Sequence, residues 1–410
     1  MRILFVTPYV PSLMRVRSLN LIRQLSKRHS VTLVALAQGD ESEDEALERL
    51  HSFCDGVYVL PLSRTRSFAS CCRRLPTAMP LQAAYTCLSE LREIVSRLAE
   101  SLRFDVLHVE HIRGAHLADG VRGVPRVFDS VDCITRLLKL RLAHQRGLIG
   151  RLLQYEELLK MRAYEPRMAI RFDSVLVTTR RDKRALEVLM RRVLGFGRRG
   201  PHLDIVRNGV DCEYFRPMPI EVEPETIVFT GRMSYFPNVQ AALRFREEVF
   251  PLIRRRQPKA KLRIVGSDPP DSIRHLDHDP AIEVTGYVPD LRPYLASAGV
   301  VVCPLSFGVG VQNKVLEAMA MGKPVVATSV ACRGIPDAVH GRHLLRADDP
   351  AEMAETVLGL FGNQDMAAAL GRGGRALTEA AYSWEAATTR LEQVYTRAVG
   401  SREEPLALAA

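Results

Sequence analysis

The 410-residue chain lacks the features that mark several classes of protein. Its eight cysteines include no Cys-x-x-Cys pair, and the adjacent Cys71 and Cys72 suit neither a metal site nor a disulfide framework, so we expect reduced, cytosolic thiols. No apolar run approaches the 18 residues of a membrane span, and the apolar start at residues 1–6 is too short for a secretory signal core. No Gly-x-Gly-x-x-Gly follows the first apolar run, which disfavours a hydride-transferring dehydrogenase. Aromatic residues are not interleaved with basic ones, so we expect no nucleic-acid partner.

The composition is that of an ordinary globular protein with a basic surface. Hydrophobic residues make up 47% and charged residues 25% of the chain, which excludes wholesale disorder, a collagen-like fibre and a disulfide-stapled miniprotein. Domains usually contain about 100–200 residues, so the length favours two domains. The formal net charge is +10. Such a surface attracts phosphates on nucleic acid, on anionic lipid or on a small substrate.

Short apolar runs alternate with segments of helical periodicity along the chain. Residues 3–6 and 31–36 are apolar runs, and residues 15–29 between them have helical spacing. Further runs of the kind typical of buried parallel strands follow at residues 56–60, 105–109, 126–129 and 174–177. After a basic, glycine-rich segment at residues 191–200 the alternation begins again. The pattern predicts two α/β domains joined near residues 195–210.

Two strand ends of the second domain carry a glycine, and ligands of open α/β sheets bind at such ends. Gly231 is followed at once by Arg232, whose guanidinium is a rigid fork of donors that matches a phosphate. A plain turn with a solvated arginine is the alternative. In residues 286–290 the glycine, Gly286, would let a flat ring approach the backbone closely. The alternative is a plain turn in which Asp290 caps the next helix.

The strongest signal lies at residues 304–328, where a glycine-bearing loop runs into a helix. Free backbone N–H groups and the helix dipole favour an anion there, and Lys314 adds a positive charge in the first turn. Glu317 follows one turn later, on the same helix face as Asn313 and Lys314. A carboxylate beside a phosphate site is well placed to accept hydrogen bonds from ribose hydroxyls. The alternative is that Lys314 and Glu317 form a pair on the helix surface.

Together these segments resemble the group 1, family 4-type glycosyltransferases. The run at residues 315–327 looks like the family's donor-binding signature. Other segments that fit the family in order and spacing are residues 208–217, 229–232, 286–288 and 382–384. Residues 2–36 resemble the family's acceptor domain, so the likeness covers nearly the whole chain. Within the family the chain looks closest to bacterial exopolysaccharide-type enzymes, including those that accompany exosortase systems.

The resemblance implies a GT-B fold, in which two Rossmann-like domains face each other across a cleft. The acceptor-binding domain would span residues 1–198 and the nucleotide-sugar-binding domain residues 199–380. A C-terminal helix in residues 381–410 would return to the first domain. The implied reaction moves a sugar from a nucleotide-diphosphate sugar to a glycan or lipid-linked acceptor, with retention of configuration and with neither metal nor cofactor. The implied location is cytoplasmic and peripheral, on the inner face of the cell membrane.

Carried over residue by residue, the resemblance assigns the donor site. Arg232 and Lys314 would hold the diphosphate and act in catalysis, and Glu317 would bind ribose. The remaining donor-binding positions are Gly231, Tyr287, Val288, Gly310, Val311 and Asn313. Val309 stands where the family often has a Glu that touches the donor sugar, so the sugar does not follow from the resemblance. The family's Lys after the Gly-Arg pair is also missing, and Lys314 would take its place.

The acceptor side offers fewer signals. The first loop lacks the Gly pair usual in the family, and we expect Arg15 and Arg17 to supply phosphate contacts instead. His108 and His111 follow a strand; without further ligands they are a poor metal site, and we place them on the acceptor side. Asp132 follows another strand, where the family often has a His-Asp pair. It would either orient a reacting hydroxyl group or cap the helix that begins near residue 134.

Residues 134–171 are rich in leucine and carry nine Lys or Arg against three Glu. Gly147 and Gly150 are expected to break or kink this helical stretch. Basic, leucine-rich helices lie on anionic bilayers, and a lipid-linked acceptor would require such docking. The alternative is that the leucines pack into the first domain's core and the arginines form a solvated face.

Two other functions fit the same resemblance. A sugar-nucleotide epimerase of the same fold would need acid and base side chains in its cleft. A degenerate transferase acting as a non-catalytic partner subunit would be consistent with Val309, whereas intact Arg232 and Glu317 argue against it.

Overall fold

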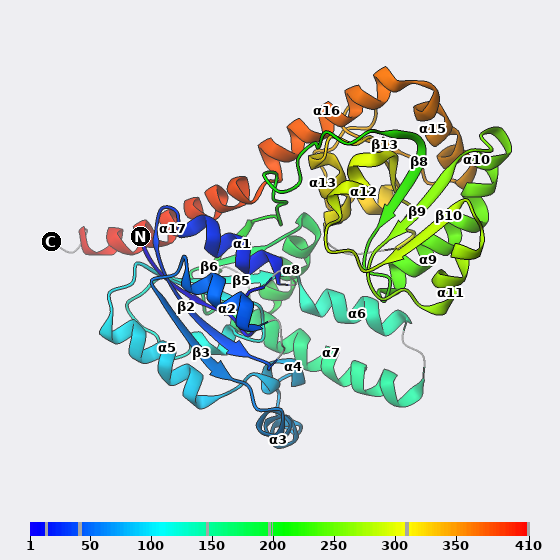
Figure 1. Cartoon of the computed structure of the whole chain (residues 1–410). Helices are drawn as coiled ribbons and strands as arrows, with labels where there is room; N and C mark the ends of the chain where they lie inside the picture. Colours follow the sequence, from blue (N-terminus) through cyan, green and yellow to red (C-terminus); the bar gives the residue numbers. More distant parts are fainter. Residues whose placement is uncertain are drawn as a thin grey trace. The chain divides into compact units, whose positions relative to one another are not determined.

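The computed structural model describes residues 1–12, 15–39, 43–144, 147–195, 198, 200–307 and 311–407 (Figure 1). The chain forms two compact units. The first unit contains Met1–Arg207 and Ala387–Ala410, and the second contains Asn208–Ala386. The boundary therefore lies after Arg207 rather than after residue 198, because the segment between them supplies the edge strand of the first sheet.

The first unit is built on a seven-stranded parallel sheet in the order β3-β2-β1-β4-β5-β6-β7. Its strands are β1 (Arg2–Val6), β2 (Ser30–Ala37), β3 (Gly56–Pro61), β4 (Val106–Glu110), β5 (Arg126–Val131), β6 (Ser174–Val177) and β7 (His202–Ile205). Apolar runs predict the first six, since central parallel strands are covered on both faces. The seventh is not predicted, because His202 and Asp204 interrupt its apolar pattern.

Helices follow or precede each strand of this sheet. They are α1 (Val16–Leu25), α2 (Glu43–His51), α3 (Arg64–Arg74), α4 (Leu81–Tyr85), α5 (Ser89–Ser101), η1 (Ala115–Ala118), α6 (Ile134–His144), α7 (Leu148–Ala169) and α8 (Arg180–Leu194). Gly147, with a φ of 91°, precedes α7 and lies between the two helices, whereas Gly150 lies inside α7. The predicted break is therefore confirmed at Gly147 and wrong at Gly150.

The C-terminal helix α17 (Trp384–Ala407) is tied to the first unit by polar contacts. The hydroxyl group of Tyr395 lies 2.8 Å from Nδ1 of His108. Arg390 and Arg397 both donate to the carboxylate of Asp204 on β7. These contacts explain why the first unit includes the end of the chain. None of the described helices is long and apolar enough to cross a membrane.

The second unit is built on a six-stranded parallel sheet in the order β10-β9-β8-β11-β12-β13. Its strands are β8 (Glu223–Thr230), β9 (Lys261–Val265), β10 (Ile282–Gly286), β11 (Ala298–Cys303), β12 (Val325–Ala327) and β13 (Leu345–Arg346). The sequence predicts all of them except β13, which has two residues and no detectable pattern.

The covering elements of the second unit include one helix that begins at the predicted donor loop, α13. They are α9 (Phe236–Arg244), η2 (Phe245–Val249), α10 (Phe250–Arg256), α11 (Asp271–Arg274), η3 (His275–His278), α12 (Arg292–Ser297), α13 (Asn313–Ala320), α14 (Ser329–Cys332), α15 (Pro350–Gly362) and α16 (Gln364–Ala381). A hydrophobic core of this unit alone packs between them and the sheet.

Both sheets reverse their strand order beside their first strand. In the first sheet β1 lies between β2 and β4, and in the second sheet β8 lies between β9 and β11. Adjacent connections then leave toward opposite faces, and a crevice forms at the carboxyl ends of these strands. The order of the strands therefore predicts that ligands bind beside the residues that follow β1 and β4 in the first unit, and beside those that follow β8 and β11 in the second.

Candidate functional site

Gly231 follows directly on β8, at a position that has no room for a side chain. Its φ is +151°, and a Cβ there would lie 2.7 Å from both Nζ of Lys314 and Nδ2 of Asn238. Gly266, at the end of the neighbouring β9, has a φ of +154°, and a Cβ there would lie 1.9 Å from the carbonyl oxygen of Gly231. The two glycines bring the ends of these strands together and leave room for the ammonium group of Lys314.

Lys314 extends from the first turn of α13 back to the end of β8. Its Nζ donates to Oδ1 of Asn238 at 2.5 Å and lies 4.9 Å from the centre of the Phe229 ring. Burial lowers the pKa of Lys314. The lysine therefore supplies a partly buried positive charge at the point where the strand order reverses, as the sequence predicts for a diphosphate site.

Asn238 connects the two predicted cations and was missed by the sequence analysis. It lies at the start of α9, is buried, and donates from Nδ2 to the carbonyl oxygen of Arg232 at 2.8 Å while its Oδ1 accepts from Lys314. The available signal was a polar residue in the first turn of a helix that follows a strand-end glycine. Asn238 thus fixes the ammonium group relative to the Gly231-Arg232 turn.

Arg232 points into solvent at this same edge. Its side chain is 60% exposed, and its Nε lies 3.3 Å from Oδ2 of Asp268. An exposed ion pair of this kind is weak, so an anionic ligand would compete with it readily. The structure therefore leaves the guanidinium group of Arg232 accessible to a ligand.

Glu317 lies one turn after Lys314 on α13 and is partly buried. Burial raises the pKa of Glu317 to about 7, and the charge of Lys314 opposes that rise. No ion pair joins Lys314 to Glu317 among the described residues, where the lysine bonds to Asn238 instead. The alternative of a surface pair on the helix is therefore wrong for this structure, and the carboxyl group remains available to a ligand.

The start of α13 has the features of an anion site. Gln312 precedes the helix without a side-chain cap hydrogen bond, so the first backbone N–H groups are not capped by that side chain. The Oδ1 atom of Asn313 is buried and has no hydrogen-bond partner among the described residues. Val311 packs partly buried against the core of the unit. The predicted Gly310, and Val309 before it, lie outside the described residues.

The predicted base-facing segment follows β10. Tyr287 is 76% exposed, and Val288 is partly buried against the core. Gly286 has a φ of +67° and accepts a hydrogen bond from the N–H of Gly266. Asp290 accepts from the backbone N–H of Arg292, the first residue of α12, at 2.9 Å, whereas the N-cap residue of that helix is Leu291.

Two of the predicted acceptor-side residues are interior instead. Arg17 is buried, and its Nε and Nη2 donate to Oδ2 of Asp129 at 2.9 and 2.7 Å. His108 is fully buried, stacks on Phe5 with ring centres 4.1 Å apart and contacts Tyr395, and burial lowers its pKa to about 3. The expectation that these two side chains contact the acceptor is corrected, because each is enclosed within the first unit.

The other two predicted acceptor-side residues lie at the β1 and β4 strand ends. Arg15 is exposed and stacks over the ring of Tyr9, 4.5 Å from its centre. Tyr9 donates from its hydroxyl group to Glu110 at 2.6 Å, and burial raises the pKa of Glu110 to about 7. His111 has a φ of 66°, which is uncommon for a residue other than glycine. These residues stay candidates for acceptor contacts.

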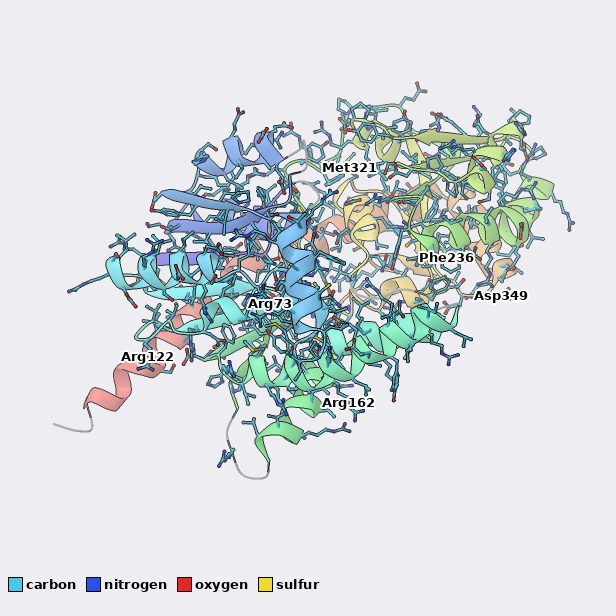
Figure 2. All side chains as sticks on the ribbon, turned by 90° about the horizontal axis from the view of Figure 1, so that it is seen from below. Arg73, Arg122, Arg162, Phe236, Met321 and Asp349 are labelled. Carbon is cyan, nitrogen blue, oxygen red and sulfur yellow. The ribbon has the colours of Figure 1, made fainter. Side chains whose placement is uncertain are left out.

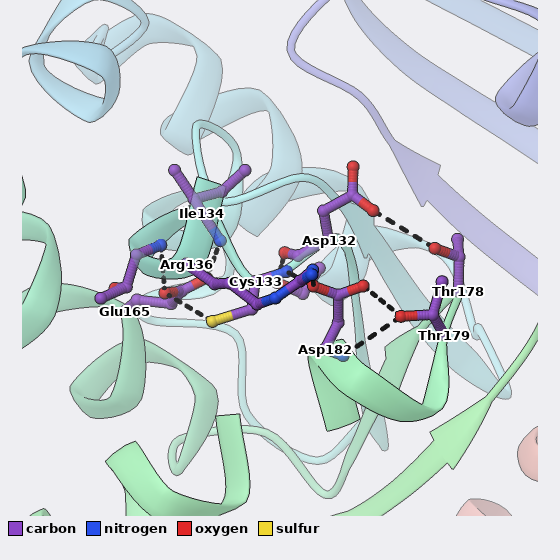
Figure 3. Close-up of polar contacts among 10 residues, drawn as sticks. Asp132, Cys133, Ile134, Arg136, Glu165, Thr178, Thr179 and Asp182 are labelled. Atoms are coloured by element: carbon purple, nitrogen blue, oxygen red, sulfur yellow. Dashed lines mark hydrogen bonds and ion pairs between the residues drawn. The ribbon is translucent and has the colours of Figure 1, made fainter. Parts of the chain in front are cut away.

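Asp132 follows β5, and its surroundings test the capping role, one of the two roles that the sequence left open (Figure 3). The N–H groups of Ile134 and Thr135, at the start of α6, donate to the carboxylate of Glu165 at 2.7 and 2.9 Å. Asp132 therefore does not cap α6. Its Oδ1 accepts from the hydroxyl group of Thr178 at 3.3 Å, and burial, followed by the charge of Asp182, raises its pKa.

The backbone before Asp132 is strained. Val131 has a φ of 64°, a conformation that β-branched residues rarely adopt. Such strain persists only where the surrounding structure enforces it, and it concentrates at functional sites.

Among the described residues, no group of three His, Cys, Asp or Glu side chains lies close enough together to hold a metal ion.

Comparison with known proteins agrees with this arrangement. Residues 224–363 match the family model described as "Glycosyl transferases group 1". Two curated relatives, both D-inositol 3-phosphate glycosyltransferases, come from Mycolicibacterium paratuberculosis (strain ATCC BAA-968 / K-10) and Mycobacterium avium (strain 104). Each is 28% identical over 222 residues, which is 48% of this chain and 48% or 50% of the relative. The chain thus matches about half the length of these relatives.

Solved structures match over nearly the whole chain. Anabaena Alr3699/HepE in complex with UDP has a TM-score of 0.66 at 14% identity, covering 97% of this chain and 100% of that protein. Sucrose-phosphate synthase from Thermosynechococcus elongatus has a TM-score of 0.62 at 16% identity, covering 98% and 100%. The two parallel sheets and these neighbours establish the predicted GT-B fold. The chain therefore has a GT-B fold, and its residues 224–363 match the family model of the group 1 glycosyl transferases.

Proposed function

We propose that this chain is a glycosyltransferase that moves a sugar from a nucleotide-diphosphate sugar to an acceptor hydroxyl group. The observation that carries the proposal is the position of Lys314, whose ammonium group is held at the end of β8 by Asn238 and beside Gly231. The start of α13 adds backbone N–H groups to the same edge. The similarity of residues 224–363 to group 1 glycosyl transferases supports this reading.

Transfer breaks the bond between the anomeric carbon and the diphosphate oxygen, and that oxygen keeps the electron pair. The acceptor oxygen forms the new bond and gives its proton to the departing diphosphate. Fixed positive charges and N–H donors aimed at the departing diphosphate stabilise such a transition state. We assign that role to Lys314, Arg232 and the first amides of α13, and on that basis propose a reaction that needs no metal and retains configuration. Asp132 would orient a reacting hydroxyl group.

We assign nucleoside binding to Glu317 and to the residues after β10. A carboxylate accepts hydrogen bonds from two ribose hydroxyl groups, and the partial burial of Glu317 strengthens such bonds. The exposed Tyr287 and the backbone of Val288 would face the base. UDP and UDP-glucose are bound by the Anabaena protein of similar fold, which makes them the first ligands to test.

For the acceptor we propose a glycan or lipid-linked precursor reached at an anionic membrane surface. The first turns of α7 carry an apolar ridge, with Leu148 87% exposed and Ile149 79% exposed. Leu152 and Leu153 extend this ridge, so the alternative that the leucines pack into the core does not hold for this part of the helix. Arg162, also on α7, projects into solvent in Figure 2. Apolar side chains on a basic element favour binding to an anionic bilayer.

Product analysis separates this proposal from its alternatives. The full chain would be incubated with a panel of nucleotide sugars, with and without candidate acceptors. Release of nucleoside diphosphate together with a glycosylated product or free sugar is expected. Conversion of the donor alone into its epimer would favour an epimerase. Binding of nucleotide without any turnover would favour a non-catalytic partner subunit.

A further inference from the structure

A polar cavity lies within the first unit, whereas the candidate donor-site residues belong to the second unit. It has a volume of about 290 Å³ and is lined by α3, the start of α5 and η1. Helix α3 follows β3 and η1 follows β4, so the cavity lies toward the carboxyl ends of the first sheet. Its volume is close to the lower end of the range for small-molecule sites, roughly 300–1,000 Å³. None of its lining residues belongs to the predicted acceptor-side set.

The cavity concentrates positive charge. Four arginines line it, namely Arg66, Arg73, Arg74 and Arg92. The one carboxylate in the lining, Glu90, is paired with Arg66 at 2.6 Å. Arg73 and Arg92 form no ion pair with any described residue. The charges of Arg73 and Arg92 therefore have no ion-pair partner among the residues that the structure describes, which favours an anionic ligand.

A buried histidine completes the lining. His116 is only 6% exposed, and neither of its ring nitrogens has a hydrogen-bond partner of good geometry among the described residues. Burial, and next the charges of Arg74 and Arg92, lower the pKa of His116 to about 4, while the nearby backbone of Thr86 and Arg113 opposes this shift. At neutral pH the ring is therefore uncharged. A neutral imidazole presents one N–H donor, and an unpaired buried donor is costly unless a ligand meets it.

We propose that this cavity binds a phosphate or diphosphate group. Arginine forks match phosphate oxygens in geometry and charge, and a neutral histidine N–H donates without repelling the arginines. A plain solvated arginine face would explain Arg73 and Arg92 but not a buried His116 beside them whose ring nitrogens lack a well-aligned hydrogen-bond partner among the described residues. Assigning the bound phosphate to the acceptor rests on the proposed function, whereas the binding itself does not.

Cys87 provides a site-specific measurement, because it lines the same cavity and is a free, half-buried thiol. The full chain would be treated with iodoacetamide at mildly alkaline pH, and alkylation of Cys87 would be followed by peptide mass spectrometry. The exposed Cys72, which does not line the cavity, is the internal reference. Saturating inorganic diphosphate should slow alkylation of Cys87 at least several-fold and leave Cys72 unchanged.

Variants test the arginines. The double variant Arg73→Gln with Arg92→Gln should weaken protection by diphosphate about tenfold or more, as expected for lost charge-assisted hydrogen bonds. Arg122→Gln is the matched control, since Arg122 is exposed in the same unit and lies apart from Arg73 in Figure 2. Equal loss of protection in the control and in the double variant would contradict the proposal. Arg232→Ala should leave protection of Cys87 intact, so a failure at the donor site remains distinguishable.

A second set of measurements distinguishes a soluble phosphorylated ligand from a lipid headgroup. Protection by inorganic diphosphate in solution indicates a soluble phosphorylated ligand. Protection by phosphatidylglycerol vesicles alone, without effect of diphosphate or of phosphatidylcholine vesicles, indicates a lipid headgroup. If neither reagent slows alkylation of Cys87 relative to Cys72, the cavity does not bind phosphate and the inference fails.

Discussion

Replacing Lys314 by methionine should slow sugar transfer without unfolding the protein. The substitution keeps an unbranched, similar-sized side chain and removes only the ammonium group. One of the three Nζ donors is used by Asn238, so two remain for a ligand. Two unit charges about 4 Å apart interact by about 4 kcal/mol at an effective dielectric constant of about 20. The developing charge is spread over several oxygens, so we expect a loss of about 3 kcal/mol, or roughly 10²-fold in kcat.

The stability of the Lys314→Met variant should change much less than its rate. Burial lowers the pKa of Lys314, so removing its ammonium group relieves a desolvation cost. In the same variant Oδ1 of Asn238 loses its hydrogen-bond donor, at a cost of about 1–3 kcal/mol. These effects oppose each other. Urea unfolding measures the stability, and release of nucleoside diphosphate from the donor found by screening measures the rate.

Lys323→Met is the matched control. Lys323 is also buried in the second unit, burial lowers its pKa to about 8, and its Nζ donates to the carbonyl oxygen of Ala296 at 2.8 Å. That variant should lose stability and keep its kcat. The reasoning fails if Lys314→Met turns over within threefold of wild type, or if both variants lose rate equally.

Three further outcomes are expected. Glu317→Ala should weaken nucleoside diphosphate binding about tenfold or more in calorimetry, because charged hydrogen bonds contribute about 1.5–3 kcal/mol; unchanged affinity would remove Glu317 from the ribose site. The pKa of Glu317 is raised to about 7 in the folded protein, so its contribution to stability is full below about pH 4.5 and is lost as the pH rises through 7. In urea unfolding, the free energy of unfolding of the wild type should therefore fall between pH 5 and 8 by about 3 kcal/mol more than that of Glu317→Gln. The same pH dependence in both proteins would refute this. A triple variant should no longer bind anionic vesicles in flotation assays but should still hydrolyse the donor; its changes are Leu148→Ser, Ile149→Ser and Leu152→Ser. Continued binding to the vesicles would contradict docking through α7.

The basic residues in the first part of the 134–171 segment are not equivalent in the structure. Arg136 donates to Asp182 at 3.0 Å, so reversing its charge would disturb the fold as well as any membrane contact. Lys139 and Arg141 form no ion pair with a described residue, and Arg146 lies outside the described residues. The exposed apolar ridge on α7 is therefore the sharper target for mutation.

Much of the fold was predictable because most of the parallel strands are buried on both faces. That burial requires a continuous apolar run, and such runs are visible in the sequence for β1 to β6 and for β8 to β12. The edge strand β7 escaped because one of its residues, Asp204, pairs with Arg390 and Arg397 of α17. No local pattern reports a partner that lies about 190 residues later in the chain.

The placement of the candidate donor-site residues at one edge of the second sheet was predictable for a similar reason. Gly231, Lys314 and Glu317 belong to contiguous segments at strand ends and a helix start, and topology brings strand ends of one sheet to one edge. Asn238 was not predictable, because its role depends on a distance of 2.5 Å to a lysine far away in sequence. Residue type and spacing contain no such information.

The sequence by itself determined where most of the strands form and where the glycines at the ends of β8 and β10 stand. Tertiary structure alone decided which charged groups are enclosed. Arg17 and Asp129, 112 residues apart, neutralise each other in the first core, and Glu165 takes the capping role that local spacing suggested for Asp132. It also left the first turns of α7 uncovered and gathered four arginines around His116. Burial is a sum over neighbours from the whole chain, so the protonation, pairing and exposure of a side chain follow only once the fold is complete.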